Sequence, residues 1–210
     1  MPRPSPLQNR AAPDGSLHAV DARGLLMGNR GGRLHWADGT LGAARWRSRA
    51  WIACRLTFHG RQRAVMGAGY TEIFFLDEAT ALAAGHRPCF ECRRAEALAF
   101  AAAWARAHGL DAPPRAGEID RVLHAERLRP PDTVPRGSLP PGAVFRLDGG
   151  FRLSVPGGAL AWSFGGYTPA RDAPADAPVV AVTPAAVRAV LAAGYAPGLH
   201  PSAEAQLSAR

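Results

Sequence analysis

Three cysteines are the residues of this chain whose types and spacing most clearly suggest chemistry. Cys89 and Cys92 lie in the stretch GHRPCFECRR with the spacing C-x-x-C, and Cys54 lies upstream in WIACRLTF. A C-x-x-C turn can place two sulfurs about 2.3 Å from one zinc ion, and tetrahedral zinc then needs two more ligands. Three cysteines cannot all pair with one another as disulfides. The pattern therefore predicts a Zn²⁺ site with Cys54 as the third ligand.

The fourth ligand is less clearly marked in the sequence. His59 follows Cys54 by five residues and lies beyond the expected end of that strand, so it could turn back toward the same ion. His86 and His35 are the other candidates. We predict His59 as the fourth ligand and a structural role for the metal.

The alternatives to zinc are a redox pair and unligated core thiols. A redox C-x-x-C pair occurs at the amino end of a helix that follows a strand. Here a helix is expected after Cys92, but the element before Cys89 has a helical pattern too, and a redox pair would leave Cys54 unused. Zinc is therefore the preferred interpretation.

The sequence around the cysteine pair also carries a family resemblance. The stretch FLDEATALAAGHRPCFECRR, within about residues 73–94, resembles the second half of the zinc module of the bacterial Ada alkylation-repair proteins. The resemblance implies that Cys89 and Cys92 bind zinc and that the unit contacts the DNA backbone. The chain is not a full Ada protein, because only Cys54 stands where that module has an earlier cysteine pair, and the Pro-Cys-His-Arg run of the alkyltransferase is absent. The methyl-acceptor role is therefore not carried over.

The charge of the chain points to an anionic partner. The formal net charge is +8, and all 25 basic residues are arginine. In the stretch from Met27 to Trp51, arginines that can pair with phosphate alternate with tryptophans that can stack on bases. The alternative is that the rings belong to the core and the arginines are simply solvated. We predict nucleic-acid contacts, with DNA favoured over RNA, from Arg30, Arg33, Trp36, Arg45, Trp46, Arg47 and Arg93.

Candidate catalytic groups are found on one expected helix. Asp120 and His124 are four residues apart and so share a helix face, where a carboxylate can orient an imidazole for acid–base work. The same arrangement is common on protein surfaces. Glu72 and Glu91 are alternative acids, which would matter if a zinc ion with three protein ligands activated water.

The elements that must position these residues indicate an α+β fold. Residues 1–24 lack periodicity and predict a flexible arm, 25–117 a zinc-binding α+β unit, and 118–210 a β-rich unit closed by a helix. Strands are expected within 51–58 and 71–75, and Asp77 and Gly85 should bound a short helix. A second helix should end at Gly109. Residues 129–142 are proline-rich and should lack regular structure, and Gly149–Gly150 should form a hairpin turn.

Three functions are compatible with these observations. The first is a zinc-containing DNA-binding protein that acts in the repair or processing of damaged DNA. The second is an enzyme that acts on a modified base or nucleotide, and the third is a zinc-stapled protein-interaction module. The sequence has no secretory signal and no apolar run of membrane-spanning length, so a cytoplasmic location is expected.

Overall fold

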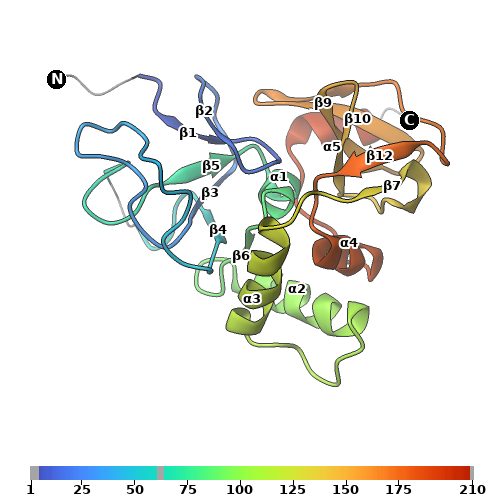
Figure 1. Cartoon of the computed structure of the whole chain (residues 1–210), viewed down its shortest axis with the longest axis horizontal. Helices are drawn as coiled ribbons and strands as arrows, with labels where there is room; N and C mark the ends of the chain where they lie inside the picture. Colours follow the sequence, from blue (N-terminus) through green and yellow to red (C-terminus); the bar gives the residue numbers. More distant parts are fainter. Residues whose placement is uncertain (1–4, 61–63, 209–210) are drawn as a thin grey trace.

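The fold combines helices with two sheets in which most strand pairs are antiparallel, and its mixed α+β class is the one that the sequence predicts. The structure is a computed structural model that describes residues 5–60 and 64–208, and within these ranges it contains five α-helices and two sheets of six strands (Figure 1). The α+β class is therefore confirmed. The first sheet contains β1 (Gln8–Ala11), β2 (Leu17–Ala19), β3 (Leu26–Asn29), β4 (Ile52–Arg55), β5 (Ile73–Phe75) and β6 (Arg87–Pro88). The second sheet contains β7 (Thr133–Pro135), β8 (Val144–Leu147), β9 (Gly150–Val155), β10 (Gly158–Ser163), β11 (Gly166–Pro169) and β12 (Pro178–Ala181). The helices are α1 (Glu78–Ala83), α2 (Arg94–Ala107), α3 (Ala116–Arg127), α4 (Ala185–Ala192) and α5 (Pro201–Ser208).

The amino-terminal segment is part of the first sheet, and this corrects the expected flexible arm. The strand order is β2-β1-β5-β3-β4-β6, with β1 parallel to β5 and β4 parallel to β6. Asn9, Ala11 and Ala12 are buried, and the Arg10 guanidinium lies 4.7 Å from the centre of the Phe74 ring. Strands of three or four residues are too short to show periodicity, so the sequence pattern missed them. Residues 1–4 of the expected arm lie outside the described residues.

The second sheet is antiparallel throughout, in the order β11-β10-β9-β8-β12-β7. The hairpin between β8 and β9 turns at Asp148 and Gly149, which have φ values of 51° and 74°. Two consecutive positive φ values are the mark of a type I′ turn. The turn thus lies one residue earlier than expected, and Gly150 begins β9 instead.

The proline-rich segment contains regular structure after all. β7 pairs with β12, and a 3₁₀ turn (Arg136–Ser138) follows it directly. The expectation of an irregular loop over 129–142 was therefore wrong in part. Proline has no amide hydrogen and so cannot donate a hydrogen bond to a neighbouring strand. An edge strand such as β7 has a neighbour on one side only, so a proline there can face the unpaired side.

Helix α1 lies between the two sheets and is buried along its whole length (Figure 1). Ala79 and Ala83 pack into the core beneath the second sheet, whereas Ala81 packs with Ile73 and Phe75 of the first. The helix begins at Asp77, whose side chain accepts the Thr80 amide, and ends before Gly85 at φ 77°. Both predicted boundaries are confirmed.

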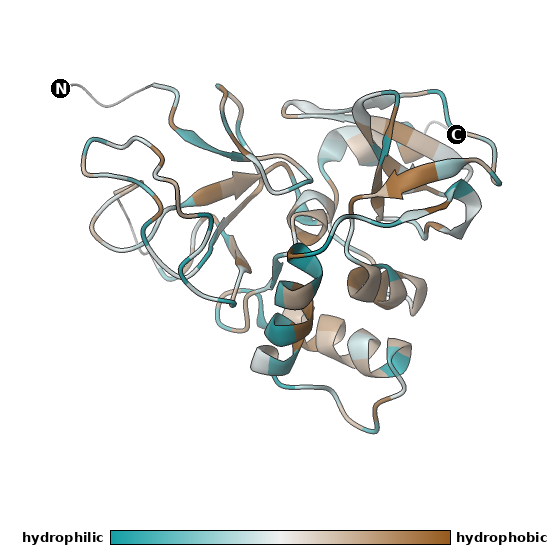
Figure 2. Cartoon of the chain, in the orientation of Figure 1, coloured by the Kyte–Doolittle hydropathy of each residue, from teal (hydrophilic) through white to brown (hydrophobic). Residues whose placement is uncertain are grey.

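The hydrophobic cores cross the expected boundary near residue 117. Phe100 and Trp104 of α2 share a core with Ile119 of α3 and Val187 of α4. Figure 2 shows apolar residues on β5 and β12 and a hydrophilic outer face on α3. Because α2 and α4 pack on each other, the two halves share one framework.

Replacing Asp77 should destabilise the whole fold. Its carboxylate accepts hydrogen bonds from the Thr80 amide (2.9 Å), the His200 amide (3.0 Å) and the Tyr167 hydroxyl (3.2 Å). Asp77→Ala removes the helix cap and leaves buried donors unpaired, so the free energy of unfolding should fall by about 2–4 kcal/mol. Urea denaturation measures this. The exposed Asp176→Ala is the control, and equal losses in both variants would contradict the central role of α1.

Candidate metal centre and surroundings

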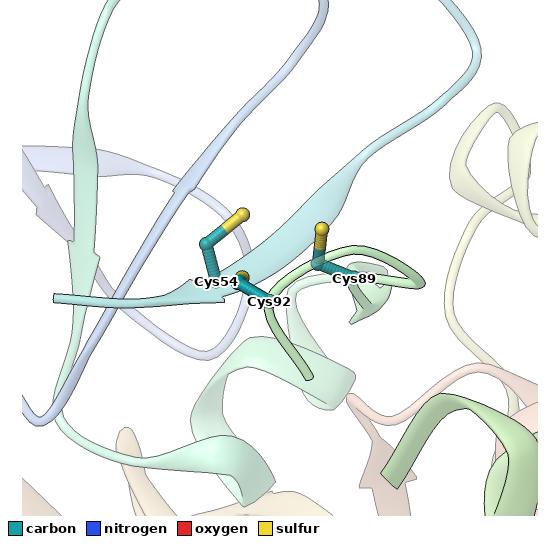
Figure 3. A group of neighbouring side chains, drawn as sticks. All are labelled: Cys54, Cys89 and Cys92. Carbon is teal, nitrogen blue, oxygen red and sulfur yellow. The ribbon is translucent and has the colours of Figure 1, made fainter. Parts of the chain in front are cut away.

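The three cysteines meet because β6 lies beside β4. β6 pairs in parallel with β4, and the Cys89 amide donates to the Ala53 carbonyl at 3.0 Å, so the residue after β6 arrives next to Cys54. A turn then brings back Cys92, whose sulfur accepts the Arg55 amide at 3.4 Å. All three thiols are buried, and their sulfurs lie within 4.8 Å of one another (Figure 3). Three buried cysteines from a strand and a turn thus form a group that could bind a metal ion.

The electrostatics of the sulfurs reflect their close approach. The pKa of Cys89 is lowered to about 5, chiefly because the Cys54 thiol donates to its sulfur, and the Cys92 and Glu91 amides act in the same direction. The same hydrogen bond and burial raise the pKa of Cys54, while burial raises that of Cys92. The close approach of the sulfurs thus favours the charged form of Cys89 and disfavours the charged forms of Cys54 and Cys92. A divalent cation would stabilise all three as thiolates.

The donor set fits a soft or borderline cation such as zinc. A tetrahedron with Zn–S bonds of about 2.3 Å has S–S edges of about 3.8 Å, which the 4.8 Å limit accommodates. A cavity of about 370 Å³ opens at the three sulfurs, and its other walls include Tyr70, Glu72 and Glu91. A fourth ligand therefore has room to approach from this side.

The structure does not bring His59 into the sulfur group. Among the described residues only the three cysteines place their ligand atoms this close together. His59 is exposed in the turn after β4, and its ring lies against Phe58 with centroids 4.0 Å apart. His86 is engaged elsewhere, between Trp51 and Phe75, and His35 bonds to Thr71 at 2.6 Å. His59 as the fourth ligand stays a prediction.

Two of the arginines predicted to contact phosphate are structural instead. Arg30 is 2% exposed and donates to the Gly15 carbonyl at 2.8 Å, and Arg93 is 4% exposed and forms a 2.8 Å ion pair with Glu78. Neither guanidinium faces solvent, which corrects the expectation for both. An arginine that pairs inside the fold cannot be told from a solvated one by its sequence position, because its partner is distant in the chain.

The remaining residues of the predicted nucleic-acid surface are accessible. Arg33, Arg45 and Arg47 are exposed, and no carboxylate in the described parts of the chain forms an ion pair with them. Trp36 is 64% exposed in a small loop closed by the bridge between His35 and Leu41. Trp46 is half-buried, 6.2 Å from Trp51 between ring centroids.

The predicted acid–base pair is not assembled as expected. Both carboxylate oxygens of Asp120 accept from Arg87, at 2.9 Å each, and this ion pair is buried. His124 instead lies edge-on to Trp46 at 5.5 Å, and burial and the nearby Arg127 lower its pKa. Asp120 therefore neutralises a buried arginine, and its catalytic role is unsupported by this geometry.

The structural role of Arg127 was not predicted from the sequence. Its guanidinium lies 4.3 Å from the centre of the Trp51 ring and donates to the carbonyls of Gly85 and Arg49. The only sequence signal was that Arg127 shares a helix face with His124.

Comparison with protein-family models, with curated proteins and with solved structures finds no match to this chain. None of the helices in the described ranges combines the length and the apolar character that crossing a membrane requires.

Removing Asp120 should destabilise the fold because it leaves Arg87 buried without a counter-ion. For Asp120→Ala we expect the free energy of unfolding to fall by about 3–5 kcal/mol. The double variant Arg87→Leu/Asp120→Leu should recover much of this loss, since an apolar pair of similar volume needs no counter-ion. Chemical denaturation of both variants, with the exposed Asp111→Ala as control, measures the effect. An Asp120→Ala protein as stable as the control would show that the pair contributes nothing.

Proposed function

We propose that this protein binds one zinc ion through Cys54, Cys89 and Cys92 and contacts DNA in the repair or processing of damaged DNA. The observation that carries the zinc assignment is the convergence of three buried sulfurs from β4 and the turn before α2. Bound there, the ion would fasten the edge of the first sheet to the helical layer. Structural zinc contributes folding free energy directly, because the unfolded chain has no preformed site.

We propose His59 as the fourth ligand, from the turn that follows β4. Its imidazole is exposed and lies against Phe58, which lines the cavity at the sulfurs. Glu72 and Glu91 line the same cavity, and an acid there is the alternative. Phe58, which packs against the cysteines, would shield the ion from solvent.

The DNA assignment rests on charge and exposure. The net charge of +8 and the exposed Arg33, Arg45 and Arg47 supply groups that pair with phosphate oxygens. Trp36 adds an accessible indole on which an unpaired base can stack. The choice of DNA over RNA rests on the resemblance of residues 73–94 to the Ada zinc module.

An enzyme acting on a modified base or nucleotide is a second candidate. One observation favours it, namely that Glu72 also lines the cavity at the three sulfurs. Its side chain is buried, and its carboxylate accepts the Met66 amide at 2.6 Å. A zinc ion with an open ligand position would supply an activated water there. Glu72 would then accept its proton.

Metal analysis tests the zinc proposal. The purified protein should contain about one zinc per chain, and Cys54→Ser or Cys89→Ser should lose the metal and lower the melting temperature by the same amount as a chelator. Met27→Leu is the matched control, because Met27 packs against the sulfurs without offering a strong ligand. His59→Ala tests the fourth ligand by its effect on zinc affinity. Unchanged melting and no metal in the wild-type protein would refute the proposal.

Salt-dependent binding tests the DNA proposal. The logarithm of the association constant for an oligonucleotide duplex should fall linearly with the logarithm of salt concentration, and Arg33→Gln and Arg47→Gln should each reduce the slope by about 0.9. Trp36→Ala should weaken single-strand binding by about 1–3 kcal/mol. Fluorescence anisotropy measures the salt slope and the affinity of each variant, and the exposed Arg171→Gln is the control. Affinity that does not change with salt would contradict the phosphate contacts.

A further inference from the structure

A second cavity of the described chain lies between the two sheets. It has a volume of about 770 Å³, within the range of small-molecule sites. The first half of the chain contributes Trp46, Trp51 and the end of α1, whereas the second contributes the end of α3 and residues of β8 and β12. Neither half could form this cavity alone.

Arg127 lines the cavity and is half-buried, and the buried Arg30 lies near the same Trp51 ring without being a lining residue. The guanidiniums of Arg30 and Arg127 lie 3.9 Å and 4.3 Å from the centre of the Trp51 ring. Neither forms an ion pair with a carboxylate in the described residues, and the acceptors that bond them are backbone carbonyls and the His86 ring. Burial is the main cause that lowers the pKa of Arg30 to about 9 and that of Arg127 to about 10. An anion in the cavity would stabilise the charged form of Arg127.

The acidic residues of the cavity are already engaged. Asp14 forms a 2.5 Å ion pair with Arg146, and Asp132 forms one with Arg188. Glu126 accepts the Ala186 amide at 3.1 Å. Three arginines of the cavity have no such pairing within the described residues: Arg45, Arg127 and Arg129. The cavity therefore has a surplus of guanidinium groups.

The same cavity offers an aromatic surface. Trp46 is half-buried at the wall, with His124 edge-on to its ring. Trp51 is buried in contact with the two guanidiniums, so Trp46 is the lining indole with exposed area. Guanidinium groups bind phosphate in a bidentate fork, and an indole face stacks on a base.

We infer that this cavity is a nucleotide site, in which Arg45, Arg127 and Arg129 hold the phosphate and Trp46 stacks on the base. The site takes a free nucleotide or a nucleotide turned out of a strand, since both present the same chemistry. The second source rests on the proposed DNA binding, because the adjoining loop that contains Arg33 and Arg47 would hold the strand.

Titration with deoxyadenosine monophosphate tests the site itself, read from tryptophan fluorescence of the full chain. Saturable binding is expected, and Trp46→Ala and Arg127→Gln should each weaken it about 10- to 100-fold. Because Arg127 also bonds to two carbonyls and its loss could unfold the chain, the exposed Arg45→Gln provides a second variant. Arg121→Gln, on the same helix but outside the cavity, is the matched control and should bind like wild type.

Two results would overturn the inference. One is the absence of saturable binding by the folded wild-type protein. The other is a combined result: inorganic phosphate displaces the nucleotide at an equal concentration, and Trp46→Ala leaves nucleotide affinity unchanged. The cavity would then be a simple anion site.

Oligonucleotides distinguish the two sources of the nucleotide. If the site takes a nucleotide from a strand, an oligonucleotide with one unpaired nucleotide should bind more tightly than the same strand with an abasic position there, and Trp46→Ala should abolish the difference. Equal affinities, with mononucleotide binding intact, would assign the site to free nucleotides. Loss of all strand binding would refute the proposed DNA function, but the mononucleotide titration would still decide the site.

Discussion

The structure depends on the burial of a single short helix between two sheets. α1 is too short to be stable in water, since isolated helices below about 12–15 residues are marginal, so its stability comes from packing on both sides. Its single acidic residue adds polar contacts: Glu78 forms an ion pair with Arg93 and accepts a hydrogen bond from the Tyr195 hydroxyl at 2.7 Å. The two halves are thereby joined through buried hydrogen bonds as well as apolar contacts.

The position of α1 also places both candidate sites. The chain leaves the helix at Gly85, passes the buried His86 and forms β6, which delivers Cys89 beside Cys54. On the other side the carbonyl of Gly85 accepts two hydrogen bonds from Arg127 and so anchors the wall of the cavity between the sheets. The sulfur group and the large cavity thus lie at either side of one tight turn.

The arginines of this chain have several physical roles, and the role of each depends on the group that its guanidinium contacts. Arg87 and Arg93 neutralise buried carboxylates, and Arg30 lies over an indole and bonds to a carbonyl. Arg33 and Arg47 face solvent without a carboxylate partner among the described residues. A net charge of +8 therefore overstates the charge available to a polyanion, because part of it is neutralised or enclosed within the fold.

Features that depend on neighbours along the chain could be predicted from the amino-acid sequence. The ends of α1 at Asp77 and Gly85 and the end of α2 near Gly109 follow from local backbone chemistry. The C-x-x-C turn was visible for the same reason. Features that depend on distant partners emerge only on folding: the place of the amino-terminal strands and the burial of Arg30 and Arg93. Cys54 was predicted as the third ligand, and the pairing of β6 with β4 is the contact that brings it beside Cys89. The sequence did not predict β7, because an edge strand tolerates prolines that a central strand does not. The cavity between the sheets is formed by residues of both halves, which meet only when both pack on α1.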